Sequence, residues 1–246
     1  MTEFDHDAAN LWLIRVSTGA PARAAQWDCL IESERQRARA FHFDRDRWLY
    51  VKAHAWLRTV LGQVTARSPQ AVHIAEAPGK KPFTACPGPD RSRVHFNLSH
   101  TQGLIAIAVS TVCEVGIDVE RIRPLTDLEG LTATVLHPAE QARFDALSEK
   151  ERAAYFFRVW TVKEAYTKAT GQGLARAFAG ISVDFCDRSR DGSTTRLLDA
   201  DGVDIQAAHV VSMPAPLVFM EGDCEYAFAF AALMEQGSVV IHHHTD

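Results

Sequence analysis

Hydrophobic and polar residues follow a helical period along some stretches of the chain and alternate along others. The helical spacing predicts helices over residues 26–40, 46–64, 138–147 and 155–170. Alternation and short apolar runs predict strands over residues 11–16, 71–76, 94–98, 104–110, 115–120, 181–185, 196–198, 203–211 and 226–233. The strands at 104–110 and 115–120 are close enough to form a hairpin.

Each half of the chain places helical segments before several strands. No low-complexity linker divides the chain. The pattern therefore predicts an α+β fold made of two similar, pseudo-symmetric halves, residues 1–112 and 113–246, in one two-lobed unit.

The helix predicted over residues 155–170 carries an unusual stripe of side chains. Trp160, Glu164 and Lys168 lie four residues apart and therefore share one face, and Gly171 follows as a typical helix end. Taken alone, the stripe favours an exposed Glu–Lys ion pair worth about 0.3–0.5 kcal/mol. Trp160 would pack the helix against its neighbours.

The strand predicted over residues 115–120 places two acids on one face. Asp118 and Glu120 are two residues apart, so they point the same way, together with Gly116. We expect the small Gly116 to leave open space beside them. Two carboxylates are ligands that Mg²⁺ takes together with water and phosphate oxygens. An exposed strand face, on which like charges discourage aggregation, is the commoner explanation of such a pair.

Basic side chains recur near predicted turns. The turn at residues 79–82 holds two lysines, Lys80 and Lys81, between a glycine and a proline that fix its backbone. Arg45 precedes the helix predicted from residue 46, where a helix N-terminus also attracts phosphate. A solvated cation explains each position equally well. The histidine run at residues 242–244 is predicted to be a solvated tail or a cloning remnant without function.

Composition argues against several classes of protein. The 246 residues, 47% of them hydrophobic, are enough for a full core. The formal net charge of −5 argues against nucleic acid as the main partner. No apolar run approaches the roughly 20 residues of a membrane span, and the acidic N-terminus lacks a signal-peptide pattern. We therefore expect a cytoplasmic protein without a membrane partner.

The five cysteines include no C-x-x-C pair, so neither a zinc site nor a disulfide framework is indicated.

Three stretches taken together resemble the 4′-phosphopantetheinyl transferase superfamily, of the surfactin-synthetase-activating type. They are Phe96–His100, Gly116–Glu120 and Trp160–Ala165 with the following Lys168 and Gly171. The resemblance covers about residues 41–175, and the ends only by length. It implies two α+β halves with the active site in the cleft between them. The size resembles that of the monomeric two-half members.

The resemblance also implies an activity. Members of this family move the 4′-phosphopantetheine arm of coenzyme A to a serine of an apo acyl, peptidyl or aryl carrier protein, with Mg²⁺, and release 3′,5′-ADP. Mn²⁺ is an alternative ion for such an oxygen site. Two other functions stay open: a catalytically silent module that binds coenzyme A or a carrier protein, and a Mg²⁺-dependent phosphohydrolase.

Roles for individual residues follow from the same resemblance. The implied metal ligands are Asp118, Glu120 and Glu164. The implied catalytic residues are Glu164, which would accept the serine proton, and Lys168, which would contact the phosphates. The implied coenzyme A contacts are Arg45, Lys81, Ser99, His100, Lys163 and Lys168, with His100 at the 3′-phosphate, and His54 stands where many members have Arg or His.

A carrier protein needs a docking surface. Carrier proteins are typically acidic, so we expect a local basic and apolar patch near residues 125–144. The candidates are Arg121, Arg123 and Arg143 as basic groups and Leu136 as an apolar one.

Overall fold

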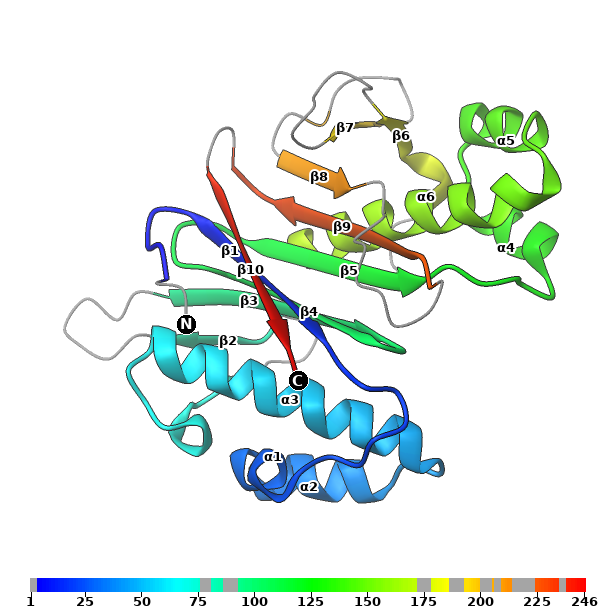
Figure 1. Cartoon of the computed structure of the whole chain (residues 1–246). Coiled ribbons are helices and arrows are strands. Elements are labelled where there is room, and N and C mark those ends of the chain that lie inside the picture. Colours follow the sequence, from blue (N-terminus) through cyan, green and yellow to red (C-terminus); the bar gives the residue numbers. More distant parts are fainter. Residues whose placement is uncertain are drawn as a thin grey trace. The chain divides into compact units, whose positions relative to one another are not determined.

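The computed structural model contains two compact units (Figure 1). The first comprises Met1–Val112 and Ser238–Asp246, and the second comprises Cys113–Gly237. The structure describes residues 4–75, 81–85, 93–171, 178–185, 193–199, 205, 209–213, 224–234 and 238–246.

The first unit is built on a five-stranded sheet. Its strands lie in the order β10 (Val239–Thr245), β1 (Ala9–Arg15), β4 (Leu104–Ser110), β3 (Arg93–Thr101) and β2 (Phe83–Ala85). Only the pair of β10 and β1 is parallel. Its helices are α1 (Ala24–Cys29), α2 (Glu32–Arg39), α3 (Asp44–Val64) and the short 3₁₀ helix η1 (Pro69–Ala71). Helix α3 lies against the sheet, because Leu57 and Leu61 share a core with Trp12 and Ile14 of β1.

The second unit has a fully antiparallel five-stranded sheet. Its strands lie in the order β5 (Val115–Arg121), β9 (Tyr226–Ala232), β8 (His209–Met213), β7 (Ser193–Leu198) and β6 (Ser182–Phe185). Its helices are α4 (Leu128–Val135), α5 (Pro138–Asp145), α6 (Glu149–Thr170) and the 3₁₀ helix η3 (Phe178–Gly180). Helix α6 packs along β5 and β9 and carries much of the core, including Phe156, Val159 and Val162.

The two units repeat one topology. Each begins with a strand and continues through two short helices, one long helix and a 3₁₀ helix. Each then forms an antiparallel meander whose last strand, β4 or β9, pairs with the first strand. The register repeats as well, since Ala9 pairs with Ser110 at the end of β4 and Val115 pairs with Ala232 at the end of β9. The α+β class is confirmed, and the cleft site stays a prediction.

Three predictions about the course of the chain are wrong. No strand forms over the described part of residues 71–76, because Ala71 ends η1 and Ala75 makes only an isolated bridge to Phe83. The strands β4 and β5 do not form a hairpin, because β5 pairs with β9, and the turn between β4 and β5 joins the two units. The helix predicted over residues 26–40 is interrupted, because Leu30 and Ile31 have extended backbones that end α1 and precede α2.

The C-terminal segment is a strand of the first unit, not a solvated tail of the second half. His242 is 1% exposed, its ring stacks on Trp12 at a centroid distance of 4.5 Å, and its Nε2 lies 3.2 Å from Oδ1 of Asn10. Residues 238–246 therefore belong with residues 1–112, because β10 adds to the edge that β1 would otherwise leave open.

The described residues include no helix long and apolar enough to cross a membrane. Cys29, Cys113 and Cys224 are free thiols in the part of the chain that the structure describes.

Helix α6 and strand β5 are in close backbone contact at Gly116. A Cβ atom on Gly116 would clash with the carbonyl oxygen of Ala165 and the backbone nitrogen of Ala169. The prediction that Gly116 leaves open space is therefore wrong, since helix backbone fills that space. The same contact shows that the face of β5 carrying Asp118 and Glu120 is the face toward α6.

We expect Gly116→Ala to destabilise the protein by about 1–3 kcal/mol or more, because the clashing atoms are backbone and cannot turn aside. Gly180→Ala, in the same unit, is the matched control, because a Cβ there would meet no atom within 4 Å. Denaturant unfolding of both variants measures the difference. An equal stability for the two variants would contradict the close contact.

Candidate functional site

The acids of β5 and the polar stripe of α6 meet in the second unit. Nζ of Lys168 lies 2.6 Å from Oδ1 of Asp118 and donates a hydrogen bond to the carbonyl oxygen of Ile117 at 3.4 Å. Asp118 is only 4% exposed. The predicted exposed Glu–Lys pair is therefore not what the helix forms, because Lys168 binds an acid on the facing strand.

Three carboxylates influence one another at this place. Burial, followed by the charge of Asp118, raises the pKa of Glu120 to about 7, while Arg123 and Lys168 act in the opposite direction. Burial also raises the pKa of Glu164, and Lys168 opposes the rise while Asp118 adds to it. The site therefore carries more negative charge than Lys168 neutralises, which favours a further cation.

The fit of this site to a metal ion is partial. Among the described residues, no group of three or more His, Cys, Asp or Glu side chains is gathered closely enough to hold an ion. Mg²⁺ needs no such cage, because it usually takes one or two carboxylates together with water and substrate phosphates. The donor chemistry and the excess negative charge of Asp118, Glu120 and Glu164 fit an ion that a phosphate substrate helps to hold.

Lys163 does not belong to this site, so its predicted role in binding coenzyme A is wrong. Its side chain is 0% exposed. Nζ donates to Oε2 of Glu140 at 2.6 Å and to the carbonyl oxygens of Val135 at 2.7 Å and Phe178 at 3.0 Å. An ammonium group has three N–H donors, and all three are used inside the protein.

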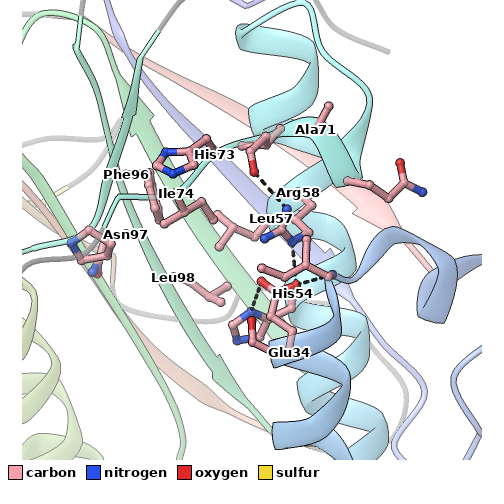
Figure 2. Close-up of a pocket in the computed structure, with 15 residues that line it drawn as sticks. Glu34, His54, Leu57, Arg58, Ala71, His73, Ile74, Phe96, Asn97 and Leu98 are labelled. Atoms are coloured by element: carbon pink, nitrogen blue, oxygen red, sulfur yellow. Dashed lines mark hydrogen bonds and ion pairs between the residues drawn. The ribbon is translucent and has the colours of Figure 1, made fainter.

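The first unit contains a cavity of about 630 Å³ between helices α2 and α3, η1 and strand β3 (Figure 2). Its walls combine apolar side chains with a few polar groups, as small-molecule sites commonly do. The lining residues are Ile31, Ser33, Glu34, His54, Leu57, Arg58, Gln70, Ala71, Val72, His73, Ile74, Pro82, Phe96, Asn97 and Leu98.

A buried ion pair lies at one side of this cavity. Figure 2 shows Arg58 and His54 directed toward Glu34, with Nε of Arg58 2.6 Å and Nδ1 of His54 3.4 Å from its carboxylate oxygens. Burial would raise the pKa of Glu34, but the hydrogen bonds from His54 and Arg58 outweigh it and lower that pKa. Arg58 also donates to the carbonyl oxygens of Pro69 and Val72. These hydrogen bonds fix the conformation of this side of the cavity.

Several residues predicted to bind coenzyme A lie next to the cavity in the chain. Ser99 and His100 continue strand β3 beyond the lining residue Leu98, and Lys81 directly precedes the lining residue Pro82. Ser99 is buried, and His100 is exposed. Gly79 and Lys80 lie outside the described residues.

Arg45 lies outside this group. It is near the start of α3, its side chain is 68% exposed, and its guanidinium contacts Asp46 at 3.5 Å and the Phe43 ring at 5.2 Å from the centroid. Arg45 does not line the cavity.

One residue of the predicted docking surface is not available for contact with a carrier protein. Leu136 is 4% exposed and belongs to the core of the second unit, so that apolar candidate is wrong. Arg143 has a side chain that is 57% exposed and lies 3.6 Å from Asp184. The docking surface stays a prediction.

Sequence reasoning missed the cavity and the pair of Arg58 and Glu34. One signal was present, because Arg58 lies at helical spacing within the apolar series of Ala55 and Leu61. A charged residue on a buried stripe requires a buried partner.

Two family models match the chain. The model described as "4′-phosphopantetheinyl transferase superfamily" matches residues 114–218, and the model described as "4′-phosphopantetheinyl transferase, N-terminal" matches residues 21–112.

Individual relatives match across both models. The 4′-phosphopantetheinyl transferase HetI of Nostoc sp. is 34% identical over 173 residues, which cover 69% of this chain and 71% of that protein. A phosphopantetheinyl transferase of Thraustochytrium sp. is 28% identical over 209 residues, covering 79% of this chain and 70% of that protein. The structure of a Thermotoga maritima holo-[acyl-carrier-protein] synthase covers 50% of this chain and 64% of that chain with a TM-score of 0.34 and 23% identity.

We expect Glu120→Gln to stabilise the protein in metal-free buffer. The folded-state pKa of Glu120, about 7, lies above its ordinary value of 4.5, so ionisation above that range costs folded-state stability. The gain in the variant should grow as the pH rises from about 4.5 to 7 and stay constant above that, on the order of 1 kcal/mol after discounting for solvent screening.

Unfolding experiments at pH 5 and pH 8 measure this gain, with the exposed Glu225→Gln as the control. A loss of stability in Glu120→Gln at pH 8 would contradict the excess of negative charge.

Proposed function

Because the chain belongs to the 4′-phosphopantetheinyl transferase superfamily and is a transferase enzyme, we propose that it moves the 4′-phosphopantetheine arm of coenzyme A to a serine of an apo acyl, peptidyl or aryl carrier protein. The other product is 3′,5′-ADP. The observation that carries the proposal is the acid-rich site of the second unit, in which Lys168 of α6 binds Asp118 of β5. A monomeric, cytoplasmic enzyme is the expectation from the sequence.

The chemistry explains why this site combines acids with a lysine. The serine hydroxyl attacks the β-phosphate of a pyrophosphate, and negative charge is spread over phosphate oxygens, so positioning and electrostatic stabilisation do most of the work. Lys168 is held by Asp118 in the site, with a side chain that is 30% exposed, and we propose that its ammonium group contacts a phosphate. A pyrophosphate would give Lys168 a second anionic partner.

Glu164 is the residue that we propose as the base. Burial raises the pKa of its carboxylate above the ordinary value. A stronger base takes a proton from the attacking hydroxyl more effectively near neutral pH. Glu164 also lies on the same helix face as Lys168, one turn away, so proton removal and phosphate binding would occur side by side.

Asp118 and Glu120, with Glu164, are the residues that we propose to hold Mg²⁺ or Mn²⁺. When bound, the ion would neutralise charge on the pyrophosphate oxygens. The ion would also favour the ionised forms of Glu120 and Glu164, whose pKa values are raised by burial and, to a smaller extent, by the charge of Asp118.

The cavity of the first unit is proposed to take the nucleotide end of coenzyme A. Apolar walls formed by residues such as Leu57 and Phe96 suit a flat adenine ring, and Asn97 and His73 supply polar groups at its edges. Lys81, Ser99 and His100, which adjoin the cavity in the chain, would bind its phosphates.

The proposed transfer is tested by mixing the protein with coenzyme A, Mg²⁺ and several apo carrier proteins and measuring the intact mass of each carrier. We expect a gain of one phosphopantetheine arm on at least one carrier. No gain on any carrier would favour a silent binding module, and free phosphopantetheine would favour a phosphohydrolase.

In the same assay, Glu164→Gln should lower the transfer rate by about 10²-fold or more, because general base catalysis contributes on that scale. Glu149→Gln, in the exposed first turn of α6, is the control and should transfer at the wild-type rate. Full activity in Glu164→Gln would remove this residue as the base.

Coenzyme A with Mg²⁺ should raise the melting temperature, since a ligand at about 100 times its Kd stabilises the folded state by about 2.7 kcal/mol. Dephospho-coenzyme A, which lacks the 3′-phosphate, should stabilise it less. His100→Ala should remove this difference between the two ligands. A difference that persists in His100→Ala would separate His100 from the 3′-phosphate.

A further inference from the structure

The buried charge of Lys163 is fully paired within the second unit. We call Lys163, Glu140 and the backbone groups that they bind the Lys163 node. Besides Nζ of Lys163, Oε2 of Glu140 accepts the backbone N–H of His137 at 2.7 Å, and Oε1 accepts that of Val183 at 2.6 Å. The node thus links α6 to the end of α4, the start of α5, η3 and strand β6.

The first unit contains an equivalent node around Arg58 and Glu34. Arg58 lies 14 residues after the first residue of α3, and Lys163 lies 14 residues after the first residue of α6. Glu34 and Glu140 are each the third residue of the short helix that precedes the long one. Each also accepts a hydrogen bond from the backbone N–H of the N-cap residue.

The cations of the two nodes also share a second kind of partner. Arg58 donates to the carbonyl oxygen of Pro69 in η1, and Lys163 donates to that of Phe178 in η3, both at 3.0 Å. In each unit, therefore, a buried cation binds a glutamate of the preceding short helix and a carbonyl oxygen of the following 3₁₀ helix, and so fixes the long helix.

Such a node contributes to the orientation of the helix more than to the stability of the fold. Replacing a buried ion pair by apolar side chains is often neutral or stabilising, because two charges must lose their water. Hydrogen bonds, however, require defined distances and angles, whereas apolar contacts tolerate sliding and rotation. The Lys163 node therefore restricts the rotation and axial position of α6 more than an apolar side chain of similar size would.

We propose that Lys163 is a positioning residue that sets the rotation of α6, so that the next residue, Glu164, and Lys168 face the acids of β5. The close contact at Gly116 fixes the distance between α6 and β5, and the node fixes the angle. The catalytic consequence rests on the proposed function, but the geometric consequence does not, because the ion pair of Lys168 and Asp118 is present in the free protein.

The geometric consequence is tested with a double-mutant cycle on the Asp118–Lys168 pair. The variants Asp118→Asn, Lys168→Met and their combination are unfolded in denaturant, first in the wild-type background and then in Lys163→Met. The proposal expects the coupling, expressed as a ratio of unfolding constants, to fall at least fivefold in Lys163→Met. A coupling unchanged within twofold would overturn it.

Two further backgrounds keep the result interpretable. Lys163→Met leaves Glu140 charged and buried, so Lys163→Met/Glu140→Gln replaces it if the single variant does not fold. Arg58→Met removes the equivalent node of the first unit and is the matched control. The proposal expects the Asp118–Lys168 coupling to stay within twofold of wild type in Arg58→Met, and an equal loss in both backgrounds would overturn it.

The catalytic consequence is tested with the transfer assay at a temperature where every variant is folded. Lys163→Met/Glu140→Gln should lower kcat at least tenfold and leave the KM for coenzyme A within threefold. Phe144→Leu, which loosens the same core without removing a charge, should change kcat less than twofold. Equal losses of kcat in both variants would show a purely structural role.

A wild-type protein without transfer activity would refute the proposed function. The coupling experiment would still decide whether Lys163 sets the rotation of α6.

Discussion

The close approach of α6 to β5 at Gly116 is the constraint on which the site depends. No side chain fits between the helix backbone and the strand at this point. Because residues two apart on a strand share a face, the same approach brings Asp118 and Glu120 under α6, where Lys168 meets Asp118 at 2.6 Å. A larger residue at position 116 would move the whole helix, and with it every polar group of the site.

The two buried regions of charge illustrate opposite electrostatic outcomes. Around Glu34, the hydrogen bonds from His54 and Arg58 outweigh burial, and the pKa of the carboxyl is lowered. Around Glu120, burial and Asp118 outweigh the nearby cations, and the pKa is raised to about 7. A carboxylate paired with a cation, such as Glu34, holds the surrounding backbone in place. A carboxylate whose ionised form is disfavoured, such as Glu120, favours the binding of a cationic ligand. This contrast separates the structural acid from the acid that we propose to be functional.

Local patterns in the sequence predicted most elements and the shared face of Asp118 and Glu120, because strand and helix periods are short-range. They failed where the decisive partner is distant in the chain. Lys163 was assigned to coenzyme A because Glu140, 23 residues away, could not be recognised as its partner. His242 looked like part of a polar tail because nothing near it indicates pairing with β1. The space at Gly116 looked open for the same reason, since the atoms that fill it belong to α6.

The repeated topology explains where the functional acids come from. Since β1 and β5 keep the same register with β4 and β9, Trp12 of the first unit corresponds to Asp118, and Ile14 corresponds to Glu120. Trp12 and Ile14 face α3 and share its core. The second unit thus carries carboxylates at positions that are apolar core in the first. Burial at those positions is a property of the fold, so the raised pKa of Glu120 follows from where that acid is placed. The scaffold tolerates them because Lys168 and Arg123 supply positive charge, but burial and the charge of Asp118 still keep the pKa of Glu120 raised, which favours a further cation at the site.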